Sequence, residues 1–136
     1  MKALVVLVAL VWTGASCSGP TTSTDMVFDS AAEGPATFAQ VQETIFDVSC
    51  ALSGCHSDSA WPNLSVDQAY DNIVNVESSR GIALVEPGDP DNSYLYLKLL
   101  ADADIDGSRM PPGGPYLTPE ALETVRAWIE KGAPND

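Results

Sequence analysis

The sequence predicts a mainly α-helical domain of about 100 residues, preceded by a segment that does not belong to the fold. Three observations predict this class. Apolar residues recur at helical spacing in four segments, and each of these segments is bounded by residues that cap or break helices. No segment shows the alternation of apolar and polar residues that marks a half-buried strand. The whole chain has 136 residues, which is the length of a single domain.

Residues 1–16 have the features of an export signal. Lys2 precedes an apolar run of ten residues, 3–12, and small residues follow it. Ten residues are too few to span a membrane, which takes about 20. The segment Gly14-Ala15-Ser16-Cys17 resembles a bacterial lipoprotein cleavage site, in which the Cys becomes the lipidated first residue. We therefore expect an exported protein on the periplasmic or cell-surface side of a bacterial membrane, anchored by lipid on Cys17, with ordinary cleavage nearby as the alternative.

Residues 17–36 are rich in Ser, Thr, Gly, Pro and acids and predict a flexible tether, which leaves 37–136 as the folded domain. Loss of residues 1–16 would leave 136 − 16 = 120 residues with 5 basic and 19 acidic side chains, a net charge of −14. This charge, with no run of Lys or Arg, excludes binding to nucleic acid or to an anionic lipid surface. A protein partner is instead expected to present a basic patch.

Two helices are predicted in the first half of the domain. The first, about 37–49, begins at Thr37, and its apolar face is Phe38, Val41, Ile45 and Val48. The second is capped by Ser65 and ends near Val76. Its apolar face is Val66, Ala69, Tyr70, Ile73 and Val74. An extended run over 81–85 and a turn over 87–90 follow, because Pro-Gly-Asp-Pro halts any helix.

Two further helices are predicted in the second half. One begins at Asp91 or Asn92 and is apolar almost all round, so we expect it at the centre of the domain; its apolar residues are Tyr94, Leu95, Leu97, Leu99 and Leu100. A loop rich in Pro and Gly occupies 102–116. The last helix begins at Thr118 and Pro119 and is ended by Gly132 and Pro134. Its apolar face is Leu122, Val125, Trp128 and Ile129.

The segment that carries chemistry follows the first helix and contains Cys50, Cys55 and His56. Covalent haem attachment usually uses two Cys separated by two residues and followed by His. The thiols bond to the porphyrin, and the His reaches the iron. Here four residues separate the two Cys, and the turn-prone Ser53 and Gly54 suit an outward bulge that would keep both sulfurs in reach.

From Phe38 to Ala133 the sequence resembles the small exported single-haem cytochrome c domains of environmental bacteria. Besides the haem segment, the resemblance is carried by three blocks in order: Val85–Leu95, Arg109–Gly113, and Leu117–Glu120 leading to Trp128–Ala133. It implies a cytochrome c-like fold of about four helices around one covalently bound haem c. It also implies that Cys50 and Cys55 attach the haem, that His56 is the proximal iron ligand, and that Met110 is the distal one.

Elimination among the available ligands also leads to Met110. The chain has one His, so two-imidazole haem and multi-His zinc sites are excluded. Met1 would leave with the export signal, and Met26 falls in the tether. Met110 is therefore the sulfur ligand that flanking structure would hold in the domain. His/Met ligation raises the reduction potential and fills the sixth position, which favours an electron carrier over an enzyme.

Other interpretations of the same residues remain open. Cys50 and Cys55 could form a disulfide in an oxidising compartment, or could hold zinc or copper with His56. Met110 could simply pack under its loop. The acids Asp102, Asp104 and Asp106 could bind calcium, although a solvated acidic edge is the simpler interpretation.

The sequence thus favours a membrane-tethered c-type cytochrome that passes single electrons to redox partner proteins. One alternative is a haem-free, disulfide-bonded lipoprotein that serves as an interaction module. The other is a haem sensor or a subunit of a larger oxidoreductase, which a free sixth position at the iron would favour.

Overall fold

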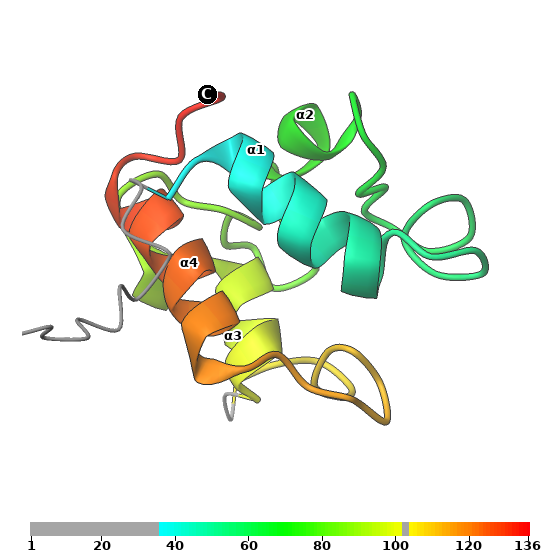
Figure 1. The fold of residues 1–136 in the computed structure, drawn as a ribbon. Coiled ribbons are helices and arrows are strands. Elements are labelled where there is room, and N and C mark those ends of the chain that lie inside the picture. The colour runs from blue at the N-terminus through cyan, green and yellow to red at the C-terminus, as the bar shows by residue number, and fades with distance from the viewer. Residues whose placement is uncertain (1–35, 102–103) are drawn as a thin grey trace, which may run out of the picture. The chain divides into compact units, whose positions relative to one another are not determined.

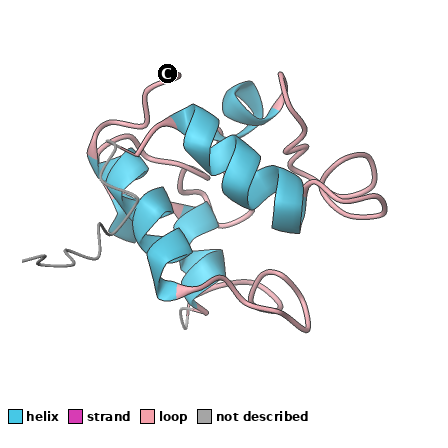
Figure 2. Ribbon diagram, in the orientation of Figure 1, coloured by secondary structure: helices cyan, strands magenta, loops and turns pink. Residues whose placement is uncertain are grey.

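The structure is a computed structural model that describes residues 36–101 and 104–136. Its helices are α1 (Phe38–Val41), the π-helix η1 (Gln42–Cys50), α2 (Ala69–Ile73), the 3₁₀-helix η2 (Pro90–Asn92), α3 (Tyr94–Leu100) and α4 (Pro119–Glu130). Within these described ranges no strand is formed (Figure 2). The mainly α class is therefore confirmed. The predicted export signal over 1–16, the predicted tether up to residue 35, Cys17 and Asp102 lie outside the described residues.

The first predicted helix is present as α1 running directly into η1. Thr37 caps it, since its hydroxyl accepts a hydrogen bond from the Gln40 N–H at 3.1 Å. In η1 the turns are wider, and the Ala51 N–H donates to the Phe46 carbonyl five residues back at 2.7 Å. The wider turn aligns Val41, Ile45 and Phe46 with the core, whereas Val48 is 64% exposed. The prediction that Val48 belongs to the apolar face was wrong, because it assumed ordinary α-helical spacing.

The second predicted helix is shorter than expected, since only Ala69–Ile73 is helical. Asp67 has a left-handed backbone with φ of 67°, which interrupts any helix starting at Ser65. Val66 is 55% exposed and so is not a core residue, contrary to the prediction. Beyond Ile73 the chain is extended, and two isolated bridges pair it with the predicted extended run. These bridges join Val74 to Val85 and Glu77 to Ala83.

The third helix, α3, begins one or two residues later than expected. Asp89 caps η2 by accepting a hydrogen bond from the Asn92 N–H at 3.2 Å, and Ser93 then precedes α3. The helix is not buried all round, because Leu100 is 42% exposed. It packs against α4 and η2. Its buried side chains are Tyr94, Tyr96 and Leu99.

The last helix, α4, follows the prediction closely. The Thr118 hydroxyl accepts a hydrogen bond from the Ala121 N–H at 3.3 Å, and Pro119 is the first helical residue. Val125, Trp128 and Ile129 are fully buried. Gly132, with φ of 97°, lies just beyond the helix end.

The core lies where α1 and η1 meet α4. The Phe38 ring lies 5.4 Å from the Trp128 ring and 5.2 Å from the Tyr70 ring, measured between centroids. The Trp128 indole donates to the Pro134 carbonyl at 2.9 Å, and the Tyr70 hydroxyl donates to the Ala133 carbonyl at 3.0 Å. These contacts tie the C-terminal segment to the helical body.

Two long loops leave this body on the same side in Figure 1, one after η1 and the other before α4. They carry the residues that the sequence singled out for haem binding. No helix in the described ranges is long and apolar enough to cross a membrane.

Candidate functional site

A cavity of about 300 Å³ lies between the two loops and the helical body. Cys50, Cys55, His56 and Met110 all line it. Most of its other walls are apolar, including Ile45, Phe46, Leu64, Leu84, Tyr94, Leu95 and Leu99. Ligand cavities of roughly this size and character bind small organic molecules and cofactors. The cavity therefore brings the four predicted site residues together around one apolar space.

The imidazole of His56 has a fixed orientation. Its Nδ1 lies 2.8 Å from the Pro62 carbonyl oxygen. A carbonyl oxygen accepts hydrogen bonds but does not donate them, so the proton of the neutral ring resides on Nδ1. This leaves the lone pair on Nε2 available. Proteins commonly orient a His that binds a metal by such a hydrogen bond from its other ring nitrogen to a backbone carbonyl.

The segment from Cys50 to Leu64 is organised by its own backbone. The Cys55 N–H donates to the Leu52 carbonyl at 2.9 Å, and the His56 N–H donates to the Cys50 carbonyl at 3.2 Å. The Leu64 N–H closes the segment on the His56 carbonyl at 2.7 Å. Residues 52–54 are exposed, and Gly54 has the left-handed φ of 80° that this turn requires. The extra residues between the two Cys thus bulge outward, as predicted.

The two Cys are free thiols with different surroundings. Cys50 is half-buried, and Cys55 is exposed. Burial, and to a smaller extent the neighbouring Cys55, raises the pKa of Cys50 from 9.0 to about 11. Cys50 is therefore protonated at neutral pH, as a thiol rather than a thiolate.

Met110 is half-buried against the core and is tied to the end of α3. Its N–H donates to the Lys98 carbonyl at 2.9 Å, and the Arg109 side chain donates from Nε to the Leu99 carbonyl at 2.7 Å. The last carbonyls of a helix lack partners within the helix, so these bonds satisfy them. The guanidinium of Arg109 also stacks 4.1 Å from the centre of the Tyr116 ring.

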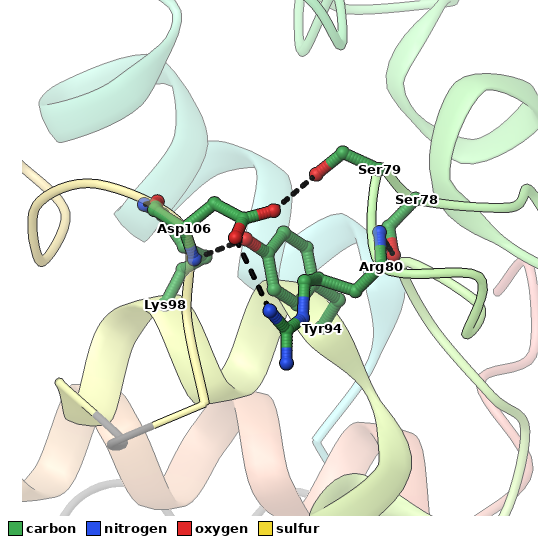
Figure 3. Close-up of polar contacts among 6 residues, drawn as sticks. All are labelled: Ser78, Ser79, Arg80, Tyr94, Lys98 and Asp106. Carbon is green, nitrogen blue, oxygen red and sulfur yellow. Dashed lines mark hydrogen bonds and ion pairs between the residues drawn. The ribbon is translucent and has the colours of Figure 1, made fainter.

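A polar cluster lies at the edge of the cavity and was not found by sequence reasoning (Figure 3). It consists of Ser79, Arg80, Tyr94, Lys98 and Asp106, of which Ser79, Tyr94, Lys98 and Asp106 line the cavity. Asp106 forms a 3.3 Å ion pair with Arg80. The only sequence signal was the position of Asp106 in the loop before Met110, and its partners are ordinary polar residues far from it along the chain.

Other metal sites find no geometric support. Within residues 36–101 and 104–136, no three His, Cys, Asp or Glu side chains are grouped as a metal site requires. The zinc arrangement of two thiolates and one imidazole is therefore not assembled there. Asp106 is engaged by Ser79 and Arg80, and Asp102 lies outside the described residues.

A second hollow, of about 420 Å³, lies on α1, η1 and α2 beside the C-terminus. Its lining includes Phe38, Tyr70 and four acids, Glu43, Asp67, Asp71 and Asp136. It is larger than the cavity near His56, but no thiol, imidazole or thioether lines it. The residues that the sequence singled out for haem binding therefore line the smaller cavity.

No protein-family model, no curated protein and no solved structure matches this chain.

Proposed function

We propose that the protein is an exported, membrane-tethered c-type cytochrome that passes single electrons between redox partners. One observation carries the proposal: Cys50, Cys55, His56 and Met110, from two loops far apart in the sequence, line a single apolar cavity. A disulfide module would require only the two Cys. It would leave the orientation of His56 and the position of Met110 without a purpose.

The residues present fit a covalently bound haem. Cys50 and Cys55 would form the thioether bonds, with His56 and Met110 as axial ligands. The free Nε2 of His56 is the donor that the iron needs, because Nδ1 is engaged by the Pro62 carbonyl. When bound, such a group supplies a one-electron couple at the iron.

The surrounding residues have roles that follow from their positions. The apolar walls from η1 and α3 would keep water away from a haem held in the cavity. The backbone turns of 50–56 hold both sulfurs on the side of the cavity.

The test is expression with the native leader in a bacterial host that has cytochrome c maturation machinery. Denaturing gels stained for haem and peptide mass spectrometry would then be applied to the purified protein. We expect a stained band and a peptide containing Cys50 and Cys55 that is heavier by one haem. The N-terminal peptide would show whether the chain begins at a lipidated Cys17.

A colourless protein whose Cys50–Cys55 peptide is two hydrogens lighter would replace the proposal with the disulfide module. A haem that stains after denaturation but has a free sixth position would instead favour a sensor or an oxidoreductase subunit. The Cys50→Ala and Cys55→Ala variants form the matched pair that assigns each thioether bond.

A further inference from the structure

We infer that Asp106 and Arg80 form a latch that holds the loop carrying Met110 in position at the cavity, an inference that rests on the proposed function. Asp106 and Arg80 would be positioning residues. Neither is expected to bind the iron. They would act by setting how readily Met110 leaves its place beside the axial position.

Asp106 makes contacts in three directions (Figure 3). Its carboxylate accepts hydrogen bonds from the Ser79 hydroxyl at 3.1 Å and from the Arg80 guanidinium at 3.3 Å. Its N–H donates to the Tyr94 hydroxyl at 2.8 Å, and its carbonyl accepts from the Lys98 ammonium at 2.7 Å. One residue of the loop is thus joined both to the turn after Ser78 and to α3.

Three of the four residues that contact Asp106, namely Ser79, Tyr94 and Lys98, line the cavity, whereas Arg80 does not. Ser79 and Lys98 line the same cavity as Met110, and the Lys98 carbonyl accepts the Met110 N–H. The Lys98 ammonium reaches a second carbonyl of the loop, that of Ser108. Lys98 therefore binds the loop before Arg109 through its ammonium and after Arg109 through its carbonyl. Asp106 binds the same loop to Ser79 and Arg80.

The turn that presents Ser79 and Arg80 is itself fixed. The Ser78 N–H donates to the Ile82 carbonyl at 2.8 Å, and the Gly81 N–H donates to the Ser78 carbonyl at 3.1 Å. The buried Ser78 hydroxyl also donates to the Ile82 carbonyl at 2.7 Å. The turn that carries Ser79 and Arg80 is therefore a fixed point to which Asp106 attaches the Met110 loop.

The latch is weak enough to open. The side chains of Arg80 and Asp106 are 43% and 53% exposed, so water and salt screen the ion pair. Exposed pairs contribute little to global stability. Loss of this pair is therefore expected to loosen the loop around Met110 and to leave the helical core unchanged.

The experiment uses the haem-loaded protein and imidazole, which competes with the thioether of Met110 for the iron. Wild type, Asp106→Asn, Arg80→Gln and the double variant would be titrated, with absorbance as the readout. Each single variant is expected to bind imidazole about two to five times more tightly, the range that an exposed pair permits. The double variant is expected to match the single ones, because the two residues act as one pair.

Glu130→Gln is the matched control. It removes an i,i+4 ion pair with Arg126 of similar exposure, 43% and 45%, on α4, whose residues do not line the cavity. Its imidazole affinity should equal that of the wild type. The denaturant midpoint of all four variants should equal that of the wild type, which separates positioning from general stabilisation.

Unchanged imidazole affinity in both single variants, with Met110 ligated in the wild type, would overturn the latch. So would effects that simply add in the double variant, or a lowered denaturant midpoint without any change in imidazole affinity. A wild type without haem would overturn the proposed function instead. That failure is seen before any variant is made, so the two outcomes are distinguishable.

Discussion

The two loops that line the cavity are held in different ways. The segment from Cys50 to Leu64 folds on itself through backbone bonds between residues a few positions apart, such as Cys55 to Leu52. The loop before α4 is held largely by side chains, through partners 26 and 27 residues away in Arg80 and Ser79. The first loop is therefore a local structure, and the second depends on the assembled domain.

This difference suggests a division of roles. A locally organised segment keeps two sulfurs and an imidazole in register even when the other loop moves. If the proposed haem is bound, the loop held by exposed side chains would carry a ligand, Met110, whose bond to the iron can be adjusted. Three measurements would break or sharpen this contrast.

The largest effect is expected in the reactivity of the two thiols in protein made without haem. The thiolate is the reactive form, and the pKa of Cys50 is raised from 9.0 to about 11, so at pH 8 Cys50 has about a hundredfold less thiolate than an ordinary thiol. Iodoacetamide should therefore label Cys50 about a hundredfold more slowly in the folded than in the urea-unfolded protein. Exposed Cys55 should be labelled readily in both.

The pH dependence of Cys50 labelling shows the direction in which its pKa is shifted. Because the pKa of Cys50 is raised, its labelling rate should continue to rise with pH up to about 11 instead of levelling near 9. The local origin of the segment predicts the same protection in Asp106→Asn. A rate that changes in this variant would contradict the contrast between the loops. Two thiols that react only after a reductant is added would establish the disulfide.

A smaller but decisive effect is expected from Met110→Ala in the haem-loaded protein. The haem should stay attached, because its attachment depends on the other loop. The iron's spin state should change and the reduction potential should fall, on the order of 0.1 V, because a thioether ligand raises the potential. Absorption spectra and a redox titration measure both.

Ile105→Ala is the control for Met110→Ala, since Ile105 is a half-buried apolar residue of the same loop that packs against the core. It should retain the wild-type spectrum. An unchanged spectrum in Met110→Ala would mean that Met110 only packs under its loop. The ligand assignment would then be wrong, although the covalent attachment could still hold.

The helices that sequence predicted best are those whose signals are local. The Thr118 cap and Pro119 fix the start of α4 within a few residues, and Thr37 does the same for α1. Val48 and Val66 were misassigned because their exposure depends on the wide turns of η1 and on the left-handed backbone of Asp67. Neither feature leaves a periodicity that a sequence pattern reveals.

The residues of the candidate site also differ in whether the sequence alone could predict them. Cys50, Cys55 and His56 lie within seven residues, so their pattern is visible in the sequence, and Met110 stands out because other ligands are scarce. Asp106 and Arg80 have no such pattern. They meet because the bridges between Val74 and Val85 and between Glu77 and Ala83 fold the chain back on itself. That pairing is a property of the tertiary structure.

The smallest effect is expected in the salt dependence of electron transfer. The chain after residue 16 has a net charge of −14, so a small cationic redox complex should react faster at low salt and an anionic one more slowly. Raising the ionic strength from about 0.01 M to 1 M shortens the screening length from about 30 Å to 3 Å. The ratio of the cationic to the anionic rate constant, measured by stopped flow, should therefore fall by about tenfold.

The difference between the two rate constants that remains at high salt would reflect the charges close to the cavity. These charges lie mainly around the Met110 loop. Arg80, Lys98 and Arg109 are three of the five basic residues after residue 16, and all three have partners around the Met110 loop. With long-range repulsion screened, these nearby cations should favour the anionic complex, and Arg80→Gln should reduce that preference. Rate constants that do not change with ionic strength for either complex would argue against a basic docking patch on the redox partner.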